Sequence, residues 1–167
     1  MSKPNDPDIT AAEARRCLSY DPATGEFRWR VRPAQRVKPG DIAGSKHTKG
    51  YWHIKFKGKL VLAHRLAWLM TYGDWPEFHI DHINGDGMDN RITNLRPCTQ
   101  TQNNQNRRHP QGKNNPYIGV TAHRNKGWRA RIRNNKVLTH LGYFKTPEEA
   151  RNAYLKAKRE LHEFNTL

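Results

Sequence analysis

Residues 78–107, FHIDHINGDGMDNRITNLRPCTQTQNNQNR, hold the pattern that decides how the first part of this chain folds. Phe78 to Ile83 alternates large apolar and polar side chains, which is the period of a strand with one buried face. The NGDG sequence at 84–87 tolerates positive φ angles and predicts a tight turn. A second short strand is expected from Ile92 to Arg96, and Pro97 is expected to end it.

A helix is predicted directly after this hairpin. Thr99, with Gln102 three residues later, has the form of a capping box, so the helix should begin there and continue to about Arg107. The predicted unit is therefore strand, loop, strand, helix.

The order of these elements decides which polar side chains can meet. Asp81 and His82 are neighbours on the first strand, so their side chains point to opposite faces. If the helix packs back across the hairpin, Asn103 approaches Asp81 and completes a two-ligand oxygen site for a hard divalent cation that keeps several waters. His82, with an ordinary pKa near ~6.5, can take a proton from water at neutral pH. Asn94, at the far end of the hairpin, can tie the long loop to the backbone.

These residues stand in an order that resembles the ββα-metal motif of HNH endonucleases, also called the His-Me finger, of the homing kind carried by phages and mobile introns. The matching residues are Asp81-His82-Ile83-Asn84-Gly85, Asp89-Asn90, Asn94-Leu95-Arg96 and Asn103. The resemblance implies that Asp81 and Asn103 bind a divalent metal, Mg²⁺ with Mn²⁺ able to substitute. It also implies His82 as general base and Asn94 as the structural middle residue. The last position holds asparagine rather than histidine, a variant that the family uses.

Each piece of this motif has an ordinary structural explanation when taken alone. NGDG is a common hairpin turn, and Asp-His pairs occur in many proteins. Five of the fifteen acidic residues fall between Asp74 and Asp89, which is also typical of a solvated loop. The joint occurrence favours the nuclease interpretation, because a turn alone requires neither an Asp-His pair before it nor an amide-rich capped helix after it.

The composition indicates a polyanionic partner. The chain has 167 residues, with 30 Lys and Arg against 15 Asp and Glu, and a formal net charge of +15. One or two small domains and a nucleic-acid ligand are expected, with an anionic membrane surface as the competitor. Against the membrane, no apolar run approaches the ~18 residues needed to span a bilayer. The start MSKPNDPD lacks a signal-peptide core, so the cytoplasm, that of the host for a phage protein, is the expected compartment. Cys17 and Cys98 lack Cys-x-x-Cys spacing and predict neither a zinc ribbon nor a disulfide scaffold.

The segment before the motif predicts further short elements. They are an arm at 1–9, a helix from a Thr10/Glu13 capping box through Leu18, a strand from Glu26 to Arg30, an ordered loop at 31–49, a hairpin at 51–62 around 57–59, and a helix from Leu62 to Tyr72 ended by Gly73. Arg28, Arg30 and Arg32 are expected on one strand face, where they either contact phosphates or are simply solvated. The stretch at 20–30 resembles the leader that often precedes phage HNH modules.

His64 and Arg65 lie on the predicted helix that precedes the motif. The same Ala-His-Arg sequence occurs in related nucleases, which makes both residues candidates for the rim of the active site. The alternative is that they are packing residues with satisfied polar groups.

A linker is predicted at 104–116, which is polar, amide-rich and basic. Arg107 and Arg108 in this linker are candidate contacts to the DNA backbone, with a plain tether as the alternative. The nuclease domain is then expected at 10–103, with its motif core at 77–107.

The last part of the chain, 117–164, predicts three strands followed by one helix. The strands are expected at 117–123, 128–133 and 136–144 with a turn at 134–135, and the helix is expected after a Thr146/Glu149 capping box with Pro147 in its first turn. Arg129, Arg131 and Arg133 share one strand face, ~7 Å apart. No acidic residue lies between Cys98 and Pro147 to neutralise them.

This part resembles the apetala-two/ethylene-response-factor DNA-binding domain, whose three-stranded sheet lies in the major groove. The matching elements are Tyr-x-Gly-Val, Trp-x-Ala-x-Ile-Arg, Leu-Gly-x-Phe and Glu-Glu-Ala-x-x-Ala-Tyr. The DNA-facing residues are expected to be Thr121, His123, Arg124, Arg129, Arg131, Arg133 and His140. Several base-reading arginines of the plant proteins are replaced here, by Ile118, Thr121 and Leu138, so the target sequence cannot be transferred.

The sequence therefore predicts an α+β protein made of an N-terminal ββα-metal nuclease module and a C-terminal three-stranded antiparallel sheet with one packed helix. The expected function is metal-dependent hydrolysis of phosphodiester bonds in double-stranded DNA, by a monomer without a small-molecule cofactor. The candidate catalytic residues are His82, Asn94, His64 and Arg65. Two alternatives stay open: a DNA-binding transcription regulator with an inactive nuclease scaffold, and a protein that binds structured RNA.

Overall fold

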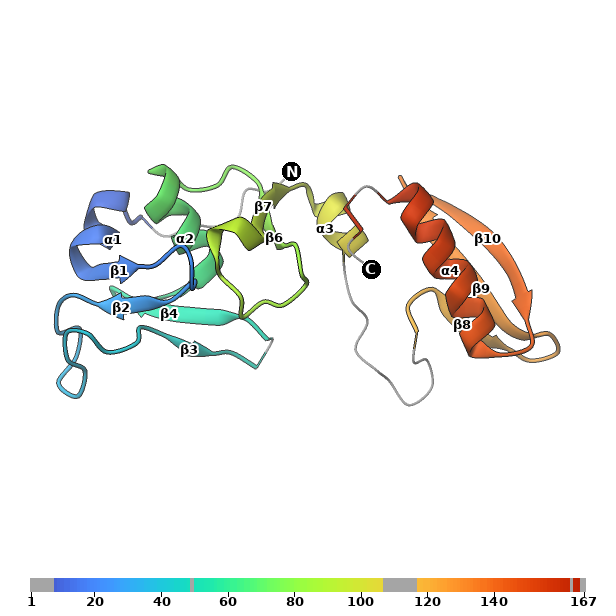
Figure 1. The fold of residues 1–167 in the computed structure, drawn as a ribbon, viewed down its shortest axis with the longest axis horizontal. Coiled ribbons are helices and arrows are strands. Elements are labelled where there is room, and N and C mark those ends of the chain that lie inside the picture. Colours follow the sequence, from blue (N-terminus) through green and yellow to red (C-terminus); the bar gives the residue numbers. More distant parts are fainter. Residues whose placement is uncertain (1–7, 49, 107–116, 163, 166–167) are drawn as a thin grey trace. The chain divides into compact units, whose positions relative to one another are not determined.

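The computed structural model describes residues 8–48, 50–106, 117–162 and 164–165. The elements in order are α1 (Ala11–Cys17), β1 (Leu18–Tyr20), β2 (Phe27–Trp29), β3 (Ser45–Lys46), β4 (Trp52–Phe56), β5 (Lys59–Leu62), α2 (Ala63–Tyr72), β6 (His79–His82), the 3-10 helix η1 (Ile92–Asn94), β7 (Leu95–Cys98), α3 (Gln100–Asn106), β8 (Val120–His123), β9 (Gly127–Asn134), β10 (Val137–Phe144) and α4 (Pro147–Leu161) (Figure 1). The chain divides into two units, 1–99 and 100–167, which are described separately.

Three small antiparallel sheets form the β-structure of the first unit. They are β1-β2, β3-β4-β5 and the β6-β7 hairpin. The predicted capping box starts α1, since Thr10 accepts from the Glu13 N–H and Glu13 reaches back to the Thr10 backbone. Lys57 and Gly58, with φ angles of 49° and 78°, make the turn between β4 and β5. These local predictions are confirmed.

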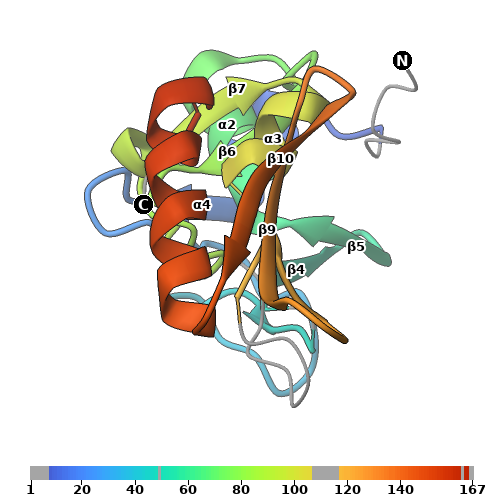
Figure 2. The ribbon, with the colours of Figure 1, turned by 90° about the vertical axis from the view of Figure 1, so that its right-hand side faces the viewer.

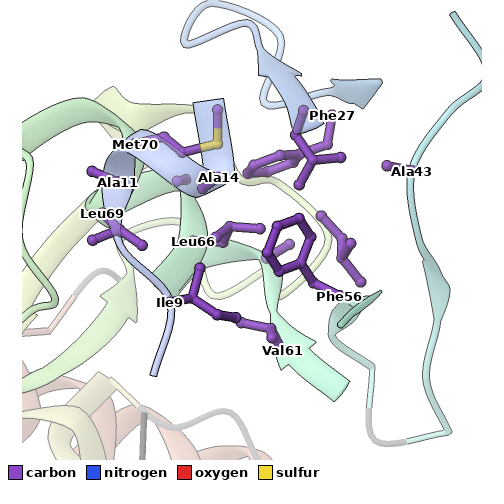
Figure 3. Close-up of a cluster of buried hydrophobic side chains, with 14 of the residues drawn as sticks. Ile9, Ala11, Ala14, Phe27, Ala43, Phe56, Val61, Leu66, Leu69 and Met70 are labelled. Atoms are coloured by element: carbon purple, nitrogen blue, oxygen red, sulfur yellow. The ribbon is translucent and has the colours of Figure 1, made fainter. Parts of the chain in front are cut away.

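Helix α2 connects the core of the first unit to the candidate site. Leu66 and Leu69 on this helix are almost fully buried and pack in one cluster with Phe27 and Phe56 (Figure 3). Gly73 ends the helix in the left-handed conformation, as predicted. Because the apolar face of α2 is fixed in this core, the residues at its start are held rigidly as well.

The N-terminal segment differs from the prediction in three places. Ile9, placed in the arm by the sequence, is buried in the core and accepts a hydrogen bond from Trp75. The short strand β1 was not predicted, and β3 lies within the segment predicted to be a loop.

The predicted row of Arg28, Arg30 and Arg32 is wrong. Strand β2 ends at Trp29, where the chain folds back so that Trp29 pairs with Gly40 and Asp41. The three arginines therefore share no strand face, and Arg28 binds Glu26 and the Gly40 carbonyl.

The hairpin that carries the motif is built from shorter strands than expected. Ile92 to Asn94 is a turn of 3-10 helix, and β7 begins only at Leu95 and continues through Pro97, which lies opposite Ile80. Pro97 is tolerated because β7 pairs with one strand only, β6, so its missing N–H breaks no hydrogen bond to a strand on the other side. The predicted start and end of this strand are wrong. The connection at 83–91 is a long loop that begins with the predicted turn, in which Gly85 takes a φ angle of 72° and its N–H donates to the His82 carbonyl.

The second unit is a three-stranded antiparallel sheet of order β10-β9-β8 with α4 across one face (Figure 2). The predicted Thr146/Glu149 capping box starts α4. Val120, Ala130 and Ile132 of the sheet and Ala150, Tyr154 and Ala157 of the helix are buried. Gly119 is required here, because a Cβ at this position would lie 2.2 Å from the Tyr154 ring.

Two details of this unit were mispredicted. The turn between β9 and β10 is Asn135-Lys136, one residue later than expected, and both residues take positive φ angles. Leu161, expected on the buried side of the helix, is 40% exposed because it lies in the last position of α4.

Helix α3 spans 100–106, close to the predicted range, and Arg107 lies outside the described residues. The predicted domain boundaries stay predictions. Within the part of the chain that the structure describes, no helix is both long and apolar enough to cross a bilayer.

Candidate active site

Strand β6 places Asp81 and His82 next to each other and buries both, each with 5% of its surface exposed. Their side chains have different partners, as expected for neighbours on a strand. Asp81 faces a guanidinium on β7, whereas the ring of His82 lies beside aromatic rings from α2 and from the residue just before β4.

The Asp81 carboxylate is paired with Arg96, which lies opposite it in the β6-β7 register. Nε and Nη2 of Arg96 donate to the same oxygen, Oδ2, at 3.0 and 2.9 Å. A buried carboxylate needs a counter-charge and hydrogen-bond donors, and Arg96 supplies both. Sequence reasoning missed this pair because it ended the second strand at the wrong residues.

The imidazole of His82 is oriented by the loop that follows it. Its Nε2 lies 3.4 Å from Oδ1 of Asn90, a residue that is itself 3% exposed. Burial lowers the pKa of His82 below its ordinary value, and the hydrogen bond to Asn90 acts in the opposite direction. A histidine in this environment is neutral near pH 7 and therefore able to accept a proton.

His64 and Tyr51 form the wall against which the His82 ring packs. The His64 ring meets the His82 ring edge-on, with centroids 4.9 Å apart, and the Tyr51 centroid lies 5.9 Å from that of His82. His64 is buried, its Nδ1 has no hydrogen-bond partner among the described residues, and burial lowers its pKa well below the ordinary value. The structure thus brings His64 to the site as a neutral neighbour of His82.

Tyr51 was missed by the sequence analysis. It is 39% exposed and lies close against the motif loop at Gly87. Glycine permits this approach, because a Cβ at position 87 would lie 2.6 Å from the Gly50 carbonyl and 2.7 Å from the Tyr51 ring. No periodic signal marks Tyr51, because tertiary packing alone places it beside His82. The glycine at 87 was the only local sign of a close approach.

Arg65 fastens the chain that enters β6. Its Nη1 donates to the Phe78 carbonyl at 2.9 Å and its Nη2 to the Pro76 carbonyl at 3.0 Å. These contacts give Arg65 a structural role, and a role at the rim of the active site stays a prediction.

Asn94 closes the loop between the two strands. Its Oδ1 accepts from the Asn84 N–H at 3.0 Å, and its Nδ2 donates to Asn84 Oδ1 at 3.0 Å and to the Asp89 carbonyl at 2.8 Å. The side chain therefore joins both ends of the loop, and it does so from a buried position.

The predicted metal ligands lie in different units. Asp81 is on β6 and Asn103 on α3, so their pairing stays a prediction. Within the described ranges no group of three or more His, Cys, Asp or Glu side chains is arranged to hold a metal ion. One carboxylate and one amide oxygen form a smaller set, and its chemistry fits a hard cation that completes its shell with water. Such a cation has to share Asp81 with Arg96.

The second unit gathers its predicted DNA-binding residues on the sheet face opposite α4. Cross-strand partners share a face, and the register pairs Thr121 with Arg129 and Arg131 with His140. We call this set the arginine face; its members are Thr121, His123, Arg129, Arg131, Arg133, His140 and Tyr143.

Tyr143 is the member of the arginine face that sequence reasoning missed. Its ring contacts His123 and His140, with centroids 4.9 and 4.8 Å away. Arg124 is exposed in the turn after β8, whereas Arg107 and Arg108 lie outside the described residues.

Residues 61–105 match the family model of HNH endonucleases. The matched span runs from β5 through α2 and the β6-β7 hairpin to α3, and so contains His64, Asp81, His82, Asn94 and Asn103. This region is an HNH endonuclease domain. No match was found among curated proteins or among solved structures. The family match ends within α3 and covers none of the sheet or α4 of the second unit, whose role has to be argued from its own residues.

Proposed function

We propose that this protein is a metal-dependent DNA endonuclease that binds duplex DNA through its second unit and hydrolyses phosphodiester bonds in its HNH domain. The observation that carries the proposal is the coincidence of the family match with a buried Asp81-His82 pair, in which the imidazole is oriented by Asn90. A buried, neutral and oriented histidine is what a general base requires.

His82 is the proposed base that takes the proton of the attacking water. The rings of His64 and Tyr51 exclude solvent from one side of it and keep the imidazole neutral before the reaction. Asp81 and Asn103 are the proposed ligands of a divalent metal, which when bound supplies positive charge to the phosphate. Asn94 holds the loop that carries Asn90 and so acts on the base indirectly.

The proposed DNA-binding surface is the arginine face. Arg131 is half-buried and Arg133 exposed, and both lie on the side of the sheet that α4 leaves uncovered. Contacts of such arginines to phosphates give affinity that falls with salt, and contacts to guanine edges give specificity. The resemblance to apetala-two/ethylene-response-factor domains supports binding in the major groove. The phage or mobile-intron type is proposed from sequence resemblance alone.

A DNA-binding regulator with an inactive nuclease scaffold is the second candidate. The pairing of Asp81 with Arg96 favours it, because the carboxylate already has a cationic partner. Binding of structured RNA is less favoured, since a sheet fits the wide major groove of B-form DNA better than the narrow one of RNA.

Incubation of the purified chain with supercoiled plasmid, with Mg²⁺ and with a chelator in its place, tests the proposal. The nuclease proposal predicts nicked or linear product with Mg²⁺ only. Retarded plasmid with no cleavage would instead support the regulator. Tighter binding to duplex RNA than to duplex DNA of equal length would contradict both.

A further inference from the structure

Asn90 occupies a position between the motif loop and His82 for which the sequence predicted no role. Its side-chain amide has a fixed orientation, because Nδ2 donates to the Met88 carbonyl at 3.0 Å. Rotating the amide by half a turn would place two carbonyl oxygens against each other. Oδ1 is therefore the atom that faces His82, at 3.4 Å from Nε2.

The chemistry of this contact decides where the imidazole carries its proton. An amide oxygen can only accept a hydrogen bond, so Nε2 of His82 must be the donor. In a neutral imidazole one nitrogen carries the proton and the other the lone pair. The basic atom of His82 is then Nδ1.

Two further contacts restrain the two partners, one acting on Asn90 and one on His82. The Tyr20 hydroxyl donates to its backbone carbonyl at 2.8 Å, from a strand 70 residues earlier in the chain. Burial raises the pKa of Tyr20, so this phenol stays protonated and remains a donor. On the other side, the edge-on contact with His64 restricts rotation of the His82 ring.

We propose that Asn90 is a positioning residue that holds His82 in its Nε2–H tautomer and directs Nδ1 at the water that attacks phosphorus. The proposal rests on the proposed nuclease function. As the water oxygen forms its bond to phosphorus, its proton moves to Nδ1 and the bond from phosphorus to the leaving oxygen breaks; the leaving oxygen is protonated from solvent. Nε2 keeps its proton throughout, and the Asn90 carbonyl oxygen stabilises the imidazolium that forms. The same logic applies to bases oriented by a third group in other hydrolases.

Two substitutions at position 90 separate orientation of the base from support of the loop. Asn90→Leu removes the acceptor, whereas Asn90→Asp keeps an acceptor at the same place, and both lose the donor to Met88. We expect Asn90→Leu to lower kcat for plasmid nicking roughly 10- to 100-fold with unchanged KM. Asn90→Asp should recover most of that loss. Tyr20→Phe loosens the Asn90 backbone and leaves the side-chain acceptor in place, so its kcat should fall less than that of Asn90→Leu.

An NMR measurement that does not depend on cleavage activity accompanies the kinetics. In the metal-free full-length chain, nitrogen NMR should show the neutral His82 ring with its proton on Nε2, and this signal should disappear in Asn90→Leu and persist in Asn90→Asp. Equal loss of kcat in the Leu and Asp variants, or a wild-type proton on Nδ1, would overturn the proposal. If Asn90→Leu does not fold, Asn90→Ala removes the same acceptor with a smaller side chain. A wild-type chain that does not cut DNA would overturn the nuclease function, while the NMR experiment would still decide whether Asn90 sets the tautomer.

Discussion

The two units present their functional side chains in opposite ways. In the HNH domain, four polar side chains are between 3% and 7% exposed and are hydrogen-bonded within the β6-β7 hairpin and its connecting loop: Asp81, His82, Asn90 and Asn94. On the arginine face the cationic side chains are half-buried or exposed. Proton transfer benefits from a fixed, water-poor site, whereas attraction to a polyanion needs cations that can reach phosphates. Substitutions in the first unit should therefore change the rate of chemistry, and those in the second should change affinity.

The largest effect is expected for His82→Ala. Loss of the proposed general base should reduce the cleavage rate roughly 10²- to 10⁴-fold, and gel-shift affinity for the same DNA should stay near that of the wild type. Single-turnover cleavage with enzyme in excess measures the rate independently of binding. A large loss of affinity would contradict the separation of the two roles.

The converse result is expected on the arginine face. Replacing Arg131 and Arg133 together by alanine should weaken DNA binding and lower the slope of log affinity against log salt by about 2, one for each phosphate contact. The cleavage rate at saturating enzyme should change little. Titrations at several salt concentrations provide the slope.

The matched control removes the same charge from the opposite side of the unit. Arg151 and Arg159 lie exposed on α4, and Arg151 packs over the Tyr117 ring. The Arg151→Ala, Arg159→Ala double variant should leave the salt slope nearly unchanged. If both double variants behave alike, net charge rather than the arginine face attracts DNA.

The elements that local chemistry specifies could be predicted from the sequence. The capping boxes at Thr10 and Thr146 start α1 and α4, and Gly73 ends α2, because each depends on residues within one helical turn. The alternation of arginines on β9 likewise predicted the arginine face. These signals act over short distances along the chain.

The partners within the site could not be predicted in the same way. Asn90 reaches His82 only because Asn94 and the turns at Asn84 and Asp86 bend the loop back, and Tyr51 comes from the segment just before β4, far earlier in the chain. The Asp81–Arg96 pair required the correct register, which was lost when the second strand was started at Ile92. Tertiary packing decided all three of these contacts.

Asn94→Ala is expected to have an intermediate effect, which lowers both the stability of the protein and its cleavage rate. It removes the three hydrogen bonds that the buried Asn94 side chain makes to Asn84 and Asp89, and should cost about 1–3 kcal/mol of unfolding free energy. The loop that carries Asn90 should loosen, so the cleavage rate should fall as well. Urea unfolding and cleavage measured on the same preparation would show whether the two losses occur together; a stable variant with wild-type activity would contradict the role assigned to Asn94.

The smallest effect is expected at an exposed ion pair of the first unit. The side-chain contact with Lys57 and the hydrogen bond from the Thr10 backbone lower the pKa of Glu13 to about 2. Because the folded pKa lies below that of the unfolded chain, the stabilisation is complete above the ordinary value near ~4.3 and is lost as the pH falls toward 2. Glu13→Gln keeps the capping box and removes only the charge, so it should lower Tm slightly at pH 7 and less at pH 3. The pair is exposed to solvent and its attraction is screened, so neither DNA affinity nor cleavage should respond. A response of either would show that surface charge in the first unit also contributes to function, and the division between a buried site for chemistry and an exposed face for binding would no longer hold.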